Sequence, residues 1–423
     1  MTQIDTSEEY ARALDAADPL APFRQRFVID DPSLIYLDGN SLGRLPQATL
    51  ALSDDIVRRQ WGGRLIRSWN EGWMDLSGRI GSKIADVIGA KTNEVVMADS
   101  TSVNLFKLAL AVLRSSGDRN EIVTDALNFP SDRYILESVA RLGQSGSMVR
   151  VAPSDDGLTV AEDAIDRLIT ERTALVALTH TAFKSGFTYD LAAITALAHR
   201  KGARILWDVS HSVGALPVDV GNAQADLAVG CGYKYLNGGP GAPAFLFVRE
   251  DSQKALDNPL SGWFSHRQQF AFAPDYEPAE DINRFLTGTP PVVSLALMEP
   301  GIDLHLEAGM GAIRAKSICQ SEYFISLWEN ILVPQGFTLN SPRNPDLRGS
   351  HVSLGHPEAY RIDQSLIHDR GIIPDFRTPD LLRFGITPLY TRYGELRSAI
   401  MALREIVRDR LYERFPVQPT GVT

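Results

Sequence analysis

Two short apolar segments, each followed at once by a chemically reactive side chain, constrain the fold of this 423-residue chain most strongly. The first, residues 204–207, leads into Asp208 and His211. The second, residues 227–231, leads into Lys234 within a glycine-rich turn. Short apolar runs bounded by turn signals are typical of buried strands. We therefore expect the acid and the lysine to lie at the ends of two core strands.

The neighbouring sequence alternates between strand-like and helix-like patterns. Between two of the strands, Leu191, Ile194 and Leu197 recur at helical spacing and predict a helix with one apolar face. Near-continuous apolar strands separated by helices predict an α/β fold with a largely parallel sheet covered on both faces. The predicted strands are Ile35–Leu37, Val95–Ala98, Glu121–Asp125, Met148–Ala152, Ala174–Thr179, Arg204–Trp207, Leu227–Cys231 and Phe245–Val248.

Polar side chains stand at or just beyond the ends of four of these strands: Asp99, Asn128, Thr179 and Asp208. Ligands of open parallel sheets bind outside the carboxyl ends of the strands. The sequence therefore predicts that these four residues share one site.

The pairing of Asp208 with Lys234 is typical of a site for pyridoxal phosphate. The carboxylate keeps the pyridine nitrogen protonated, and the lysine bonds covalently to the cofactor. A crowded, partly apolar site that contains cations lowers the pKa of a lysine enough for this role. The alternatives are an exposed lysine in a glycine loop and a strand-end carboxylate satisfied by its own neighbours.

Ser100 and Thr101 precede a predicted helix whose apolar face carries Phe106, Leu110 and Leu113. Hydroxyl residues at this place cap helices. They can also hold a phosphate dianion at the positive end of the helix. With a candidate cofactor lysine downstream, we favour phosphate binding.

Composition narrows the class of protein. A hydrophobic content of 44% allows a large core, divided into two domains or a domain and a lobe. A net charge of −10 argues against a nucleic-acid partner. Two cysteines, Cys231 and Cys319, cannot form a disulfide framework, and no Cys/His spacing matches a metal site. A polar N-terminus and the lack of a long apolar run predict a cytoplasmic chain without a signal peptide or membrane span.

Several motifs of the chain resemble segments of bacterial kynureninase, a family in the class V branch of fold-type-I pyridoxal phosphate enzymes. These motifs occur in the same order as in the family and span most of the chain. They are Tyr36–Gly43, Leu65–Asn70, Asn128–Asp132, Tyr233–Gly241, Ser261–Phe264 and Arg383–Gly385. The resemblance implies a seven-stranded, mainly parallel sheet flanked by helices, with a smaller α+β domain. It also implies three parts: residues 1–60 joining the small domain, 61–300 as the large cofactor domain and 301–423 as the small domain.

The resemblance assigns roles by position. Lys234, Tyr233 and Asp208 are the implied catalytic residues. Besides Ser100 and Thr101, the implied cofactor contacts within the chain are Phe129 over the ring, Asp132, Thr179 and His211. Trp263 and Thr289 are implied to contact the cofactor of a neighbouring subunit. The resemblance therefore implies a homodimer. The implied substrate contacts are Arg383 at the carboxylate and Trp69 and Trp263 at the aryl group. Arginine suits a carboxylate because its guanidinium binds the two oxygens bidentately.

The implied reaction is hydrolysis of L-kynurenine, or of its 3-hydroxy derivative, to anthranilate or 3-hydroxyanthranilate and L-alanine in tryptophan catabolism. His180–Lys184 and Gly232 depart from the family pattern, which leaves the preferred substrate open, including another γ-oxo amino acid.

Three other functions compete with this one. A desulfurase-like lyase needs a mobile cysteine, which neither Cys231 nor Cys319 suits. A binding module without catalysis does not explain intact Lys234, Asp208 and Arg383. A hydrolase with Ser41 as nucleophile fits the G-x-S-x-G pattern of residues 39–43, but Pro46 disfavours the helix that must follow the serine.

Overall fold

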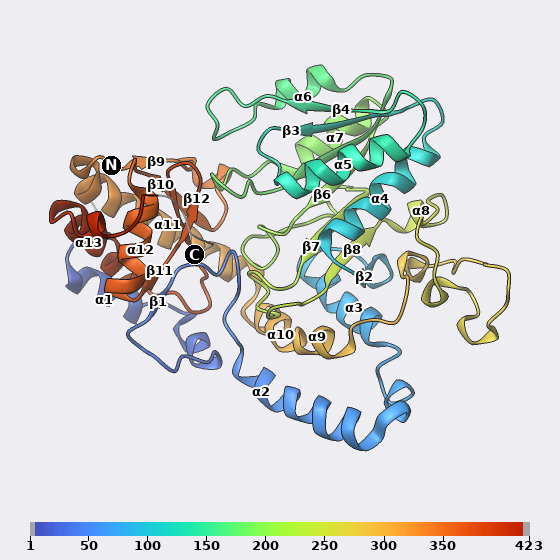
Figure 1. The fold of residues 1–423 in the computed structure, drawn as a ribbon, viewed down its shortest axis with the longest axis horizontal. Coiled ribbons are helices and arrows are strands. Elements are labelled where there is room, and N and C mark those ends of the chain that lie inside the picture. Colours follow the sequence, from blue (N-terminus) through green and yellow to red (C-terminus); the bar gives the residue numbers. More distant parts are fainter. Residues whose placement is uncertain (1–4, 418–423) are drawn as a thin grey trace.

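The computed structural model describes residues 5–417, which fold into a large and a small lobe (Figure 1). Residues 1–4, on which part of the signal-peptide prediction depends, lie outside the described range, as do residues 418–423. Within the described range, no helix is long and apolar enough to cross a membrane.

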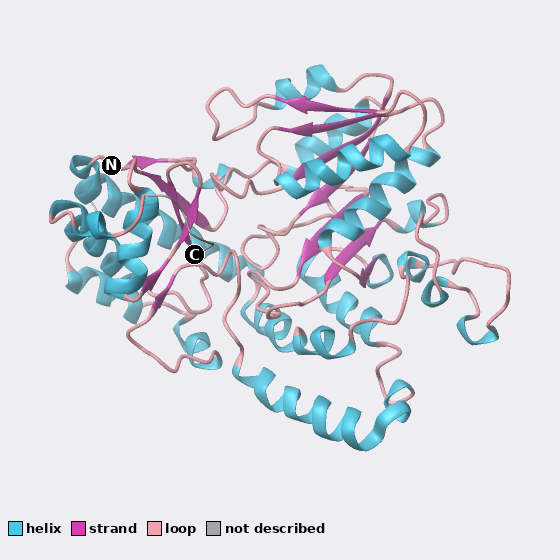
Figure 2. Cartoon of the chain, viewed as in Figure 1, coloured by secondary structure: helices cyan, strands magenta, loops and turns pink. Residues whose placement is uncertain are grey.

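A seven-stranded sheet forms the centre of the large lobe, with strand order β2-β8-β7-β6-β5-β3-β4 (Figure 2). Only β8 runs antiparallel to its neighbours, and every other pairing is parallel. The strands are β2 (Val95–Met97), β3 (Glu121–Asp125), β4 (Met148–Ala152), β5 (Thr173–Thr179), β6 (Arg204–Asp208), β7 (Leu227–Cys231) and β8 (Ala244–Val248).

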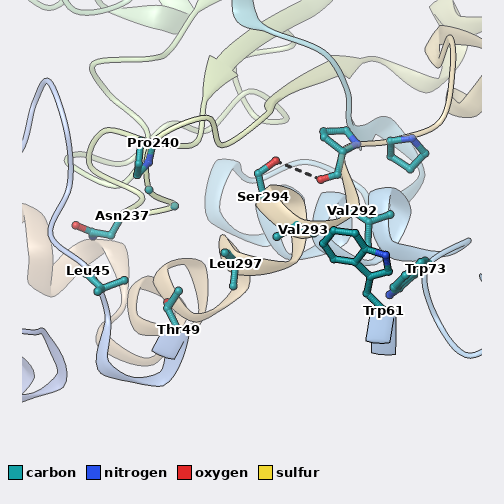
Figure 3. Close-up of a pocket in the computed structure, with 14 residues that line it drawn as sticks. Leu45, Thr49, Trp61, Trp73, Asn237, Pro240, Val292, Val293, Ser294 and Leu297 are labelled. Carbon is teal, nitrogen blue, oxygen red and sulfur yellow. Dashed lines mark hydrogen bonds between the residues drawn. The ribbon is translucent and has the colours of Figure 1, made fainter. Parts of the chain in front are cut away.

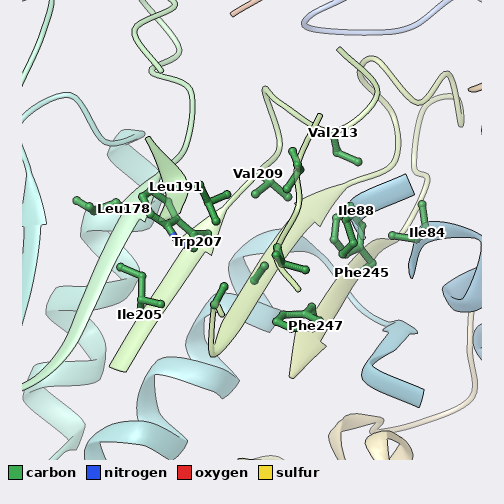
Figure 4. Close-up of a cluster of buried hydrophobic side chains, with 14 of the residues drawn as sticks. Ile84, Ile88, Leu178, Leu191, Ile205, Trp207, Val209, Val213, Phe245 and Phe247 are labelled. Carbon is green, nitrogen blue, oxygen red and sulfur yellow. The ribbon is translucent and has the colours of Figure 1, made fainter. Parts of the chain in front are cut away.

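Helices cover both faces of this sheet, as the apolar strands require. The side chains of β5, β7 and β8 are buried along their whole length. Trp207 of β6 is fully buried and packs in a cluster with Val209, Phe245 and Phe247 (Figure 4). The helices of this lobe are α3 (Leu76–Ile88), α4 (Thr101–Ser115), α5 (Pro130–Leu142), α6 (Glu162–Leu168), α7 (Leu191–Arg200), α8 (Glu250–Gln253), α9 (Val292–Leu297) and α10 (Glu299–Ala308).

The small lobe is built on a four-stranded antiparallel sheet of order β12-β13-β10-β9. A separate parallel pair joins β1 to β11, so the N-terminal part of the chain lies against the C-terminal part. The strands are β1 (Ile35–Tyr36), β9 (Thr338–Leu339), β10 (His351–Gly355), β11 (Ile372–Ile373), β12 (Asp375–Arg377) and β13 (Leu381–Gly385). The helices are α1 (Glu8–Ala16), α11 (Met310–Leu327), α12 (Ala359–Arg370) and α13 (Tyr393–Arg408).

One helical segment, α2 (Gln47–Asp54) continued by the π-helix η2 (Asp55–Arg64), extends along the edge of the molecule away from both sheets (Figure 1). It carries exposed apolar side chains, among them Trp61, which is 59% exposed.

The predicted α/β class and each predicted strand are confirmed, with boundaries shifted by at most one residue. Ser41 lies in a turn, and the next helix begins only at Gln47, so the turn lacks the strand-to-helix geometry of a hydrolase nucleophile. The three-part division at residues 60 and 300 stays a prediction.

Candidate active site

Eight of the thirteen predicted site residues converge on a cavity of about 240 Å³ where the ends of β6 and β7 meet the small-lobe sheet. The residues that follow β6 and β7 lie close together because parallel strands have their carboxyl ends at the same edge of the sheet. The cavity is lined by Asn40, Ser41, Thr101, Ser102, Phe129, Ser131, Asp132, Phe183, Asp208, Ser210, His211, Tyr233, Lys234, Arg377 and Arg383.

The Lys234 amine points into this cavity beside an imidazole. Its Nζ lies 3.2 Å from His211 Nε2 and 5.9 Å from the centre of the Phe129 ring. Burial, together with the cations Lys234 and Arg383, holds the pKa of His211 well below its ordinary value. A neutral imidazole accepts a hydrogen bond from the amine. His211 therefore orients Lys234 without adding a second positive charge.

Two buried carboxyl groups, Asp208 and Asp132, face each other across the cavity floor. Asp208 Oδ1 accepts hydrogen bonds from the Ser210 backbone N–H at 2.8 Å and from its hydroxyl at 2.6 Å. Burial and the neighbouring Asp208 carboxylate raise the pKa of Asp132 well above its ordinary value. Asp132 Oδ2 is buried and has no hydrogen-bond partner among residues 5–417. An N–H donor inserted from the cavity would satisfy this pair.

The N-terminus of α4 borders the same cavity with hydroxyl groups. Thr101 and Ser102 line it, and Ser102 Oγ lies 3.0 Å from Ser131 Oγ. Ser100 is the N-cap of the helix, since its Oγ accepts from the Val103 backbone N–H at 3.4 Å. Free N–H groups and hydroxyls at a helix start bind phosphate. Thr101, Ser102 and Ser131 are therefore better placed for a phosphate than Ser100, which lines the adjoining cavity.

Tyr233 stands between the two cavities, because it lines both. Its neighbour Cys231, its burial and the Asp208 carboxylate raise the pKa of its hydroxyl above the ordinary value. The hydroxyl therefore keeps its proton near neutral pH and is able to donate it.

Arg383 enters the cavity from β13 and is almost fully buried, with 2% of its side chain exposed. It pairs with the Asp375 carboxylate, and it donates to Phe183 O at 2.7 Å and to Ser41 Oγ at 2.8 Å. The Asn40 side-chain oxygen, in the amide orientation that satisfies both groups, accepts from Arg383 Nε at 2.7 Å. These contacts fix the guanidinium at the cavity wall.

Besides Ser100, four predicted contacts do not line this cavity within one chain. The Thr179 hydroxyl is buried and donates to Thr181 O at 3.3 Å. Trp69 packs edge-on against Trp73, and Trp263 stacks near Phe272. Thr289 lines the adjoining cavity of about 470 Å³ together with Ser100 and Tyr233. Their predicted roles stay predictions, and those of Trp263 and Thr289 concern a neighbouring subunit.

The expectation that Asp99, Asn128, Thr179 and Asp208 share one site is wrong in part, because only Asp208 lines the 240 Å³ cavity. Asp99 instead pairs with the buried Lys107 at 2.7 Å. Asn128 turns inward, and its Nδ2 donates to Thr124 Oγ1 at 3.0 Å. Strand ends share an edge, but local hydrogen bonds decide which side chains face the ligand.

The structure explains the two departures from the family pattern. A Cβ at Gly232 would lie 2.1 Å from Met298 Cε and 3.0 Å from Pro243 O, so the Met298 side chain fills the space that a side chain at residue 232 would need. Phe183 lines the cavity and packs edge-on against Phe129, with ring centres 5.1 Å apart. The aromatic residue at 183 thus adds an apolar wall beside the predicted ring site.

The residues present fit pyridoxal phosphate. The Asp208 carboxylate lines the cavity and can accept a hydrogen bond from a ring N–H, and Phe129 offers a face to a flat ring. Hydroxyl groups gather at a helix start, and the Lys234 amine lies in the same cavity. Sequence reasoning did not single out Ser102, Ser131, Ser210, Phe183 or Arg377. Of these five, only Ser210 could have been predicted from the local sequence. It lies two residues after Asp208, and an Asp side chain often accepts a hydrogen bond from the backbone N–H two residues ahead.

Two family models match parts of this chain, and known proteins resemble it over nearly its whole length. The model described as "Kynureninase C-terminal domain" matches residues 313–403, and the DegT/DnrJ/EryC1/StrS aminotransferase family matches residues 67–226. A kynureninase from Pseudomonas fluorescens is 47% identical over 98% of each chain. One from Burkholderia mallei is 43% identical over 95% of each chain.

Solved structures support the fold. A cysteine desulfurase from Thermococcus onnurineus has a TM-score of 0.77 at 20% identity, covering 94% of this chain and 98% of its own. A cystine C–S lyase has a TM-score of 0.76 at 21% identity, covering 88% of this chain and 98% of its own. At such identities the likeness concerns the fold alone, whereas the relatives of higher identity decide the family. This chain belongs to the kynureninase family.

Proposed function

We propose that this chain hydrolyses L-kynurenine to anthranilate and L-alanine with Lys234, Tyr233 and Asp208 as its catalytic residues. The observation that carries the proposal is the convergence, in one cavity, of Lys234 beside His211, a carboxylate pair and a buried arginine. Family membership makes the chain a pyridoxal phosphate enzyme that hydrolyses a carbon–carbon bond in kynurenine.

Pyridoxal phosphate, when bound, supplies a ring that accepts electron density from the substrate's α-carbon. Asp208 holds the proton on the ring nitrogen, supported by its two hydrogen bonds from Ser210. Thr101, Ser102 and Ser131 hold the phosphate at the start of α4.

Lys234, as the free amine, removes the proton from the substrate's α-carbon, and neutral His211 is placed to accept a hydrogen bond from that amine. Tyr233, whose raised pKa keeps its hydroxyl protonated, passes a proton during attack of water on the γ-carbonyl. Arg383 binds the α-carboxylate, and its fixed guanidinium orients the bond that breaks. The apolar rings of Phe129 and Phe183 exclude water from one wall.

A desulfurase activity lacks a suitable nucleophile. Cys231 is buried, and burial raises the pKa of its thiol. Cys319 is exposed on α11 of the small lobe and does not line the cavity. A thiol transfers sulfur as a thiolate within reach of the substrate, which neither cysteine provides.

The test is a single-turnover experiment with the cofactor-loaded protein, L-kynurenine and 3-hydroxy-L-kynurenine. Release of anthranilate or its hydroxy analogue is followed by fluorescence, with Lys234→Ala as control. Rapid product release that disappears in the variant supports both the reaction and the lysine. A cofactor band without cleavage of either compound refutes the substrate assignment, and the ratio of the two rates defines the preferred ring substituent.

We also propose that two copies form the smallest active unit. The α2–η2 segment exposes Leu50, Val57 and Trp61, and the short 3-10 helix that follows it, Leu65–Trp69, exposes Leu65 and Ile66, the last to 76%. Beside it lies an apolar cavity of about 650 Å³, lined by this segment, the turn after Lys234 and α9 (Figure 3). Apolar surface of this extent is typical of a protein interface. A second copy covering it is also what the predicted roles of Trp263 and Thr289 in a neighbouring subunit's cofactor site require.

Light scattering after size-exclusion chromatography tests the dimer. The wild type is expected at twice its 46.5 kDa chain mass. Ile66→Ser is expected to shift the protein toward the monomer and lower activity, whereas Leu142→Ser, on an exposed part of α5, is not. A wild type that runs as a monomer with full activity refutes the proposal.

A cytoplasmic location also stays a proposal. It is supported by two cysteines that are both free thiols. Fractionation of cells that express the chain tests it, and recovery of the protein outside the cytoplasm would contradict it.

A further inference from the structure

Two guanidinium groups, not one, line the proposed active-site cavity: Arg383 and Arg377. They come from neighbouring antiparallel strands of the small lobe. Asp375 of β12 lies directly opposite Arg383 of β13, and Arg377 lies opposite Leu381. Since side chains two residues apart share a face of a sheet, Asp375, Arg377 and Arg383 all project toward the same side.

Arg383 has little capacity left for a ligand. A guanidinium has five N–H donors. Phe183 O, Ser41 Oγ, the Asp375 carboxylate and the Asn40 oxygen use four of them, and only 2% of the side chain is exposed. Bidentate binding of a carboxylate needs two donors on one side of the group. Arg383 alone therefore cannot provide a bidentate contact without giving up one of its partners.

Arg377 has the donors that Arg383 lacks. Its Nη2 lies 2.8 Å from Asp375 Oδ2, and its Nη1 donates to Phe376 O at 3.2 Å. Its side chain is 31% exposed, so it reaches the cavity with the rest of its donors directed away from these two partners.

The two guanidiniums share one close carboxylate partner. Asp375 pairs with both of them, which leaves one positive charge among the three residues. Two more carboxyls lie nearby, Asp38 and Asp363, and burial raises the pKa of each to about 7, so each carries only about half of its negative charge at pH 7. The group therefore has no full set of carboxylate partners inside the chain.

We propose that Arg377 binds the α-carboxylate of the substrate together with Arg383, and that Asp375 positions both guanidiniums. This inference rests on the proposed function, because it assumes an amino-acid substrate whose carboxylate faces β12 and β13. Arg377 is then a substrate-binding residue, and the carboxylate is held between two cations rather than on one.

The test compares ligands that differ in the carboxylate, using the cofactor-loaded enzyme and calorimetry. The probe with a carboxylate is 4-(2-aminophenyl)-4-oxobutanoate, and the probe without one is kynuramine. Arg377→Gln is expected to weaken binding of the keto acid by roughly 10- to 100-fold, the effect of losing a hydrogen bond to a charged group, and to leave kynuramine binding unchanged. Arg377→Lys is expected to restore part of the affinity, because it restores the charge but not the planar pair of donors.

The control variant is Arg343→Gln, which removes a surface arginine paired with Glu329 at 2.8 Å and far from the cavity lining. It is expected to change neither affinity. Equal weakening of both probes by Arg377→Gln would indicate a structural role and overturn the proposal, as would unchanged binding of the keto acid.

A different result would refute the proposed function itself: the wild type would release no anthranilate from L-kynurenine. In that case the Arg377 variants are compared by their binding of L-alanine, which is measured by the visible absorbance of the cofactor. This measurement does not depend on cleavage of a substrate. Weaker L-alanine binding in Arg377→Gln but not in Arg343→Gln supports a carboxylate contact for any amino-acid substrate. Equal binding in both variants refutes it.

Discussion

Replacing Asp363 by asparagine should make the protein's stability less dependent on pH. Asp363 lies on α12, fully buried. Its Oδ2 accepts from Gln364 Nε2 at 3.2 Å, while Oδ1 has no hydrogen-bond partner in the described part of the chain. Burial, and then the neighbouring carboxylates Asp375 and Asp38, raise its pKa from 3.8 to about 7.

The sign follows from the direction of this shift. The folded state keeps the Asp363 proton to a higher pH than the unfolded state, so this group lowers stability progressively as pH rises from 3.8 toward about 7. A shift of about three units costs about 4 kcal/mol above pH 7, at about 1.4 kcal/mol per unit. Part of this cost is already present at pH 5, where the unfolded carboxyl is ionised, which leaves a difference of about 3 kcal/mol between pH 5 and pH 8.

Asparagine has nearly the same shape as aspartate and no charge. The free energy of unfolding of Asp363→Asn, relative to that of the wild type, should therefore rise by about 3 kcal/mol between pH 5 and pH 8. Urea unfolding at both pH values, followed by circular dichroism, measures the change. Asp369→Asn, on the exposed end of the same helix, is the matched control and should show no such gain. A difference between Asp363→Asn and wild type that is the same at both pH values would refute the reasoning.

Three further changes test the site and its support. Lys234→Ala should remove the covalently held cofactor band and lower turnover by roughly 10²- to 10⁴-fold, because a positioned proton acceptor is lost; retention of both would contradict the assignment. Asp208→Asn should lower kcat by roughly 10²- to 10³-fold through loss of a preorganised charge, with stability little changed, and an unchanged kcat would exclude the ring-nitrogen role. Lys107→Met should destabilise the fold by about 2–4 kcal/mol, because it leaves Asp99 and Phe285 O without the amine that holds each at 2.7 Å; an unchanged urea midpoint would show that the pair contributes nothing.

Local sequence patterns were sufficient for the strands of the large lobe. The strands β3, β4 and β7 begin and end at the predicted residues, because short apolar runs between polar turns have few other ways to bury their side chains. The same patterns placed Asp208 and Lys234 at strand ends, and a parallel sheet brings those ends to one edge. The core of the candidate site was therefore predictable without tertiary information.

The antiparallel β8 and the small-lobe contacts were not predictable in this way. Strand direction depends on the path of the connecting chain, which local periodicity does not encode. Arg377 reaches the cavity only because β12 pairs with β13 and places it on the same face as Arg383. No signal at residue 377 itself indicates this.

The sequence by itself determined the fold class and the family, and it predicted a cofactor lysine with an acidic partner, since each depends on residues close together in the chain or on similarity along its length. Tertiary structure alone decided which strand-end side chains face the cavity, that Met298 fills the space beside Gly232, and how Asp375 joins two arginines. Those features arise from contacts between segments far apart in the chain, such as Arg383 with Phe183 O and Ser41 Oγ. Their energies depend on burial, which only the packed molecule defines.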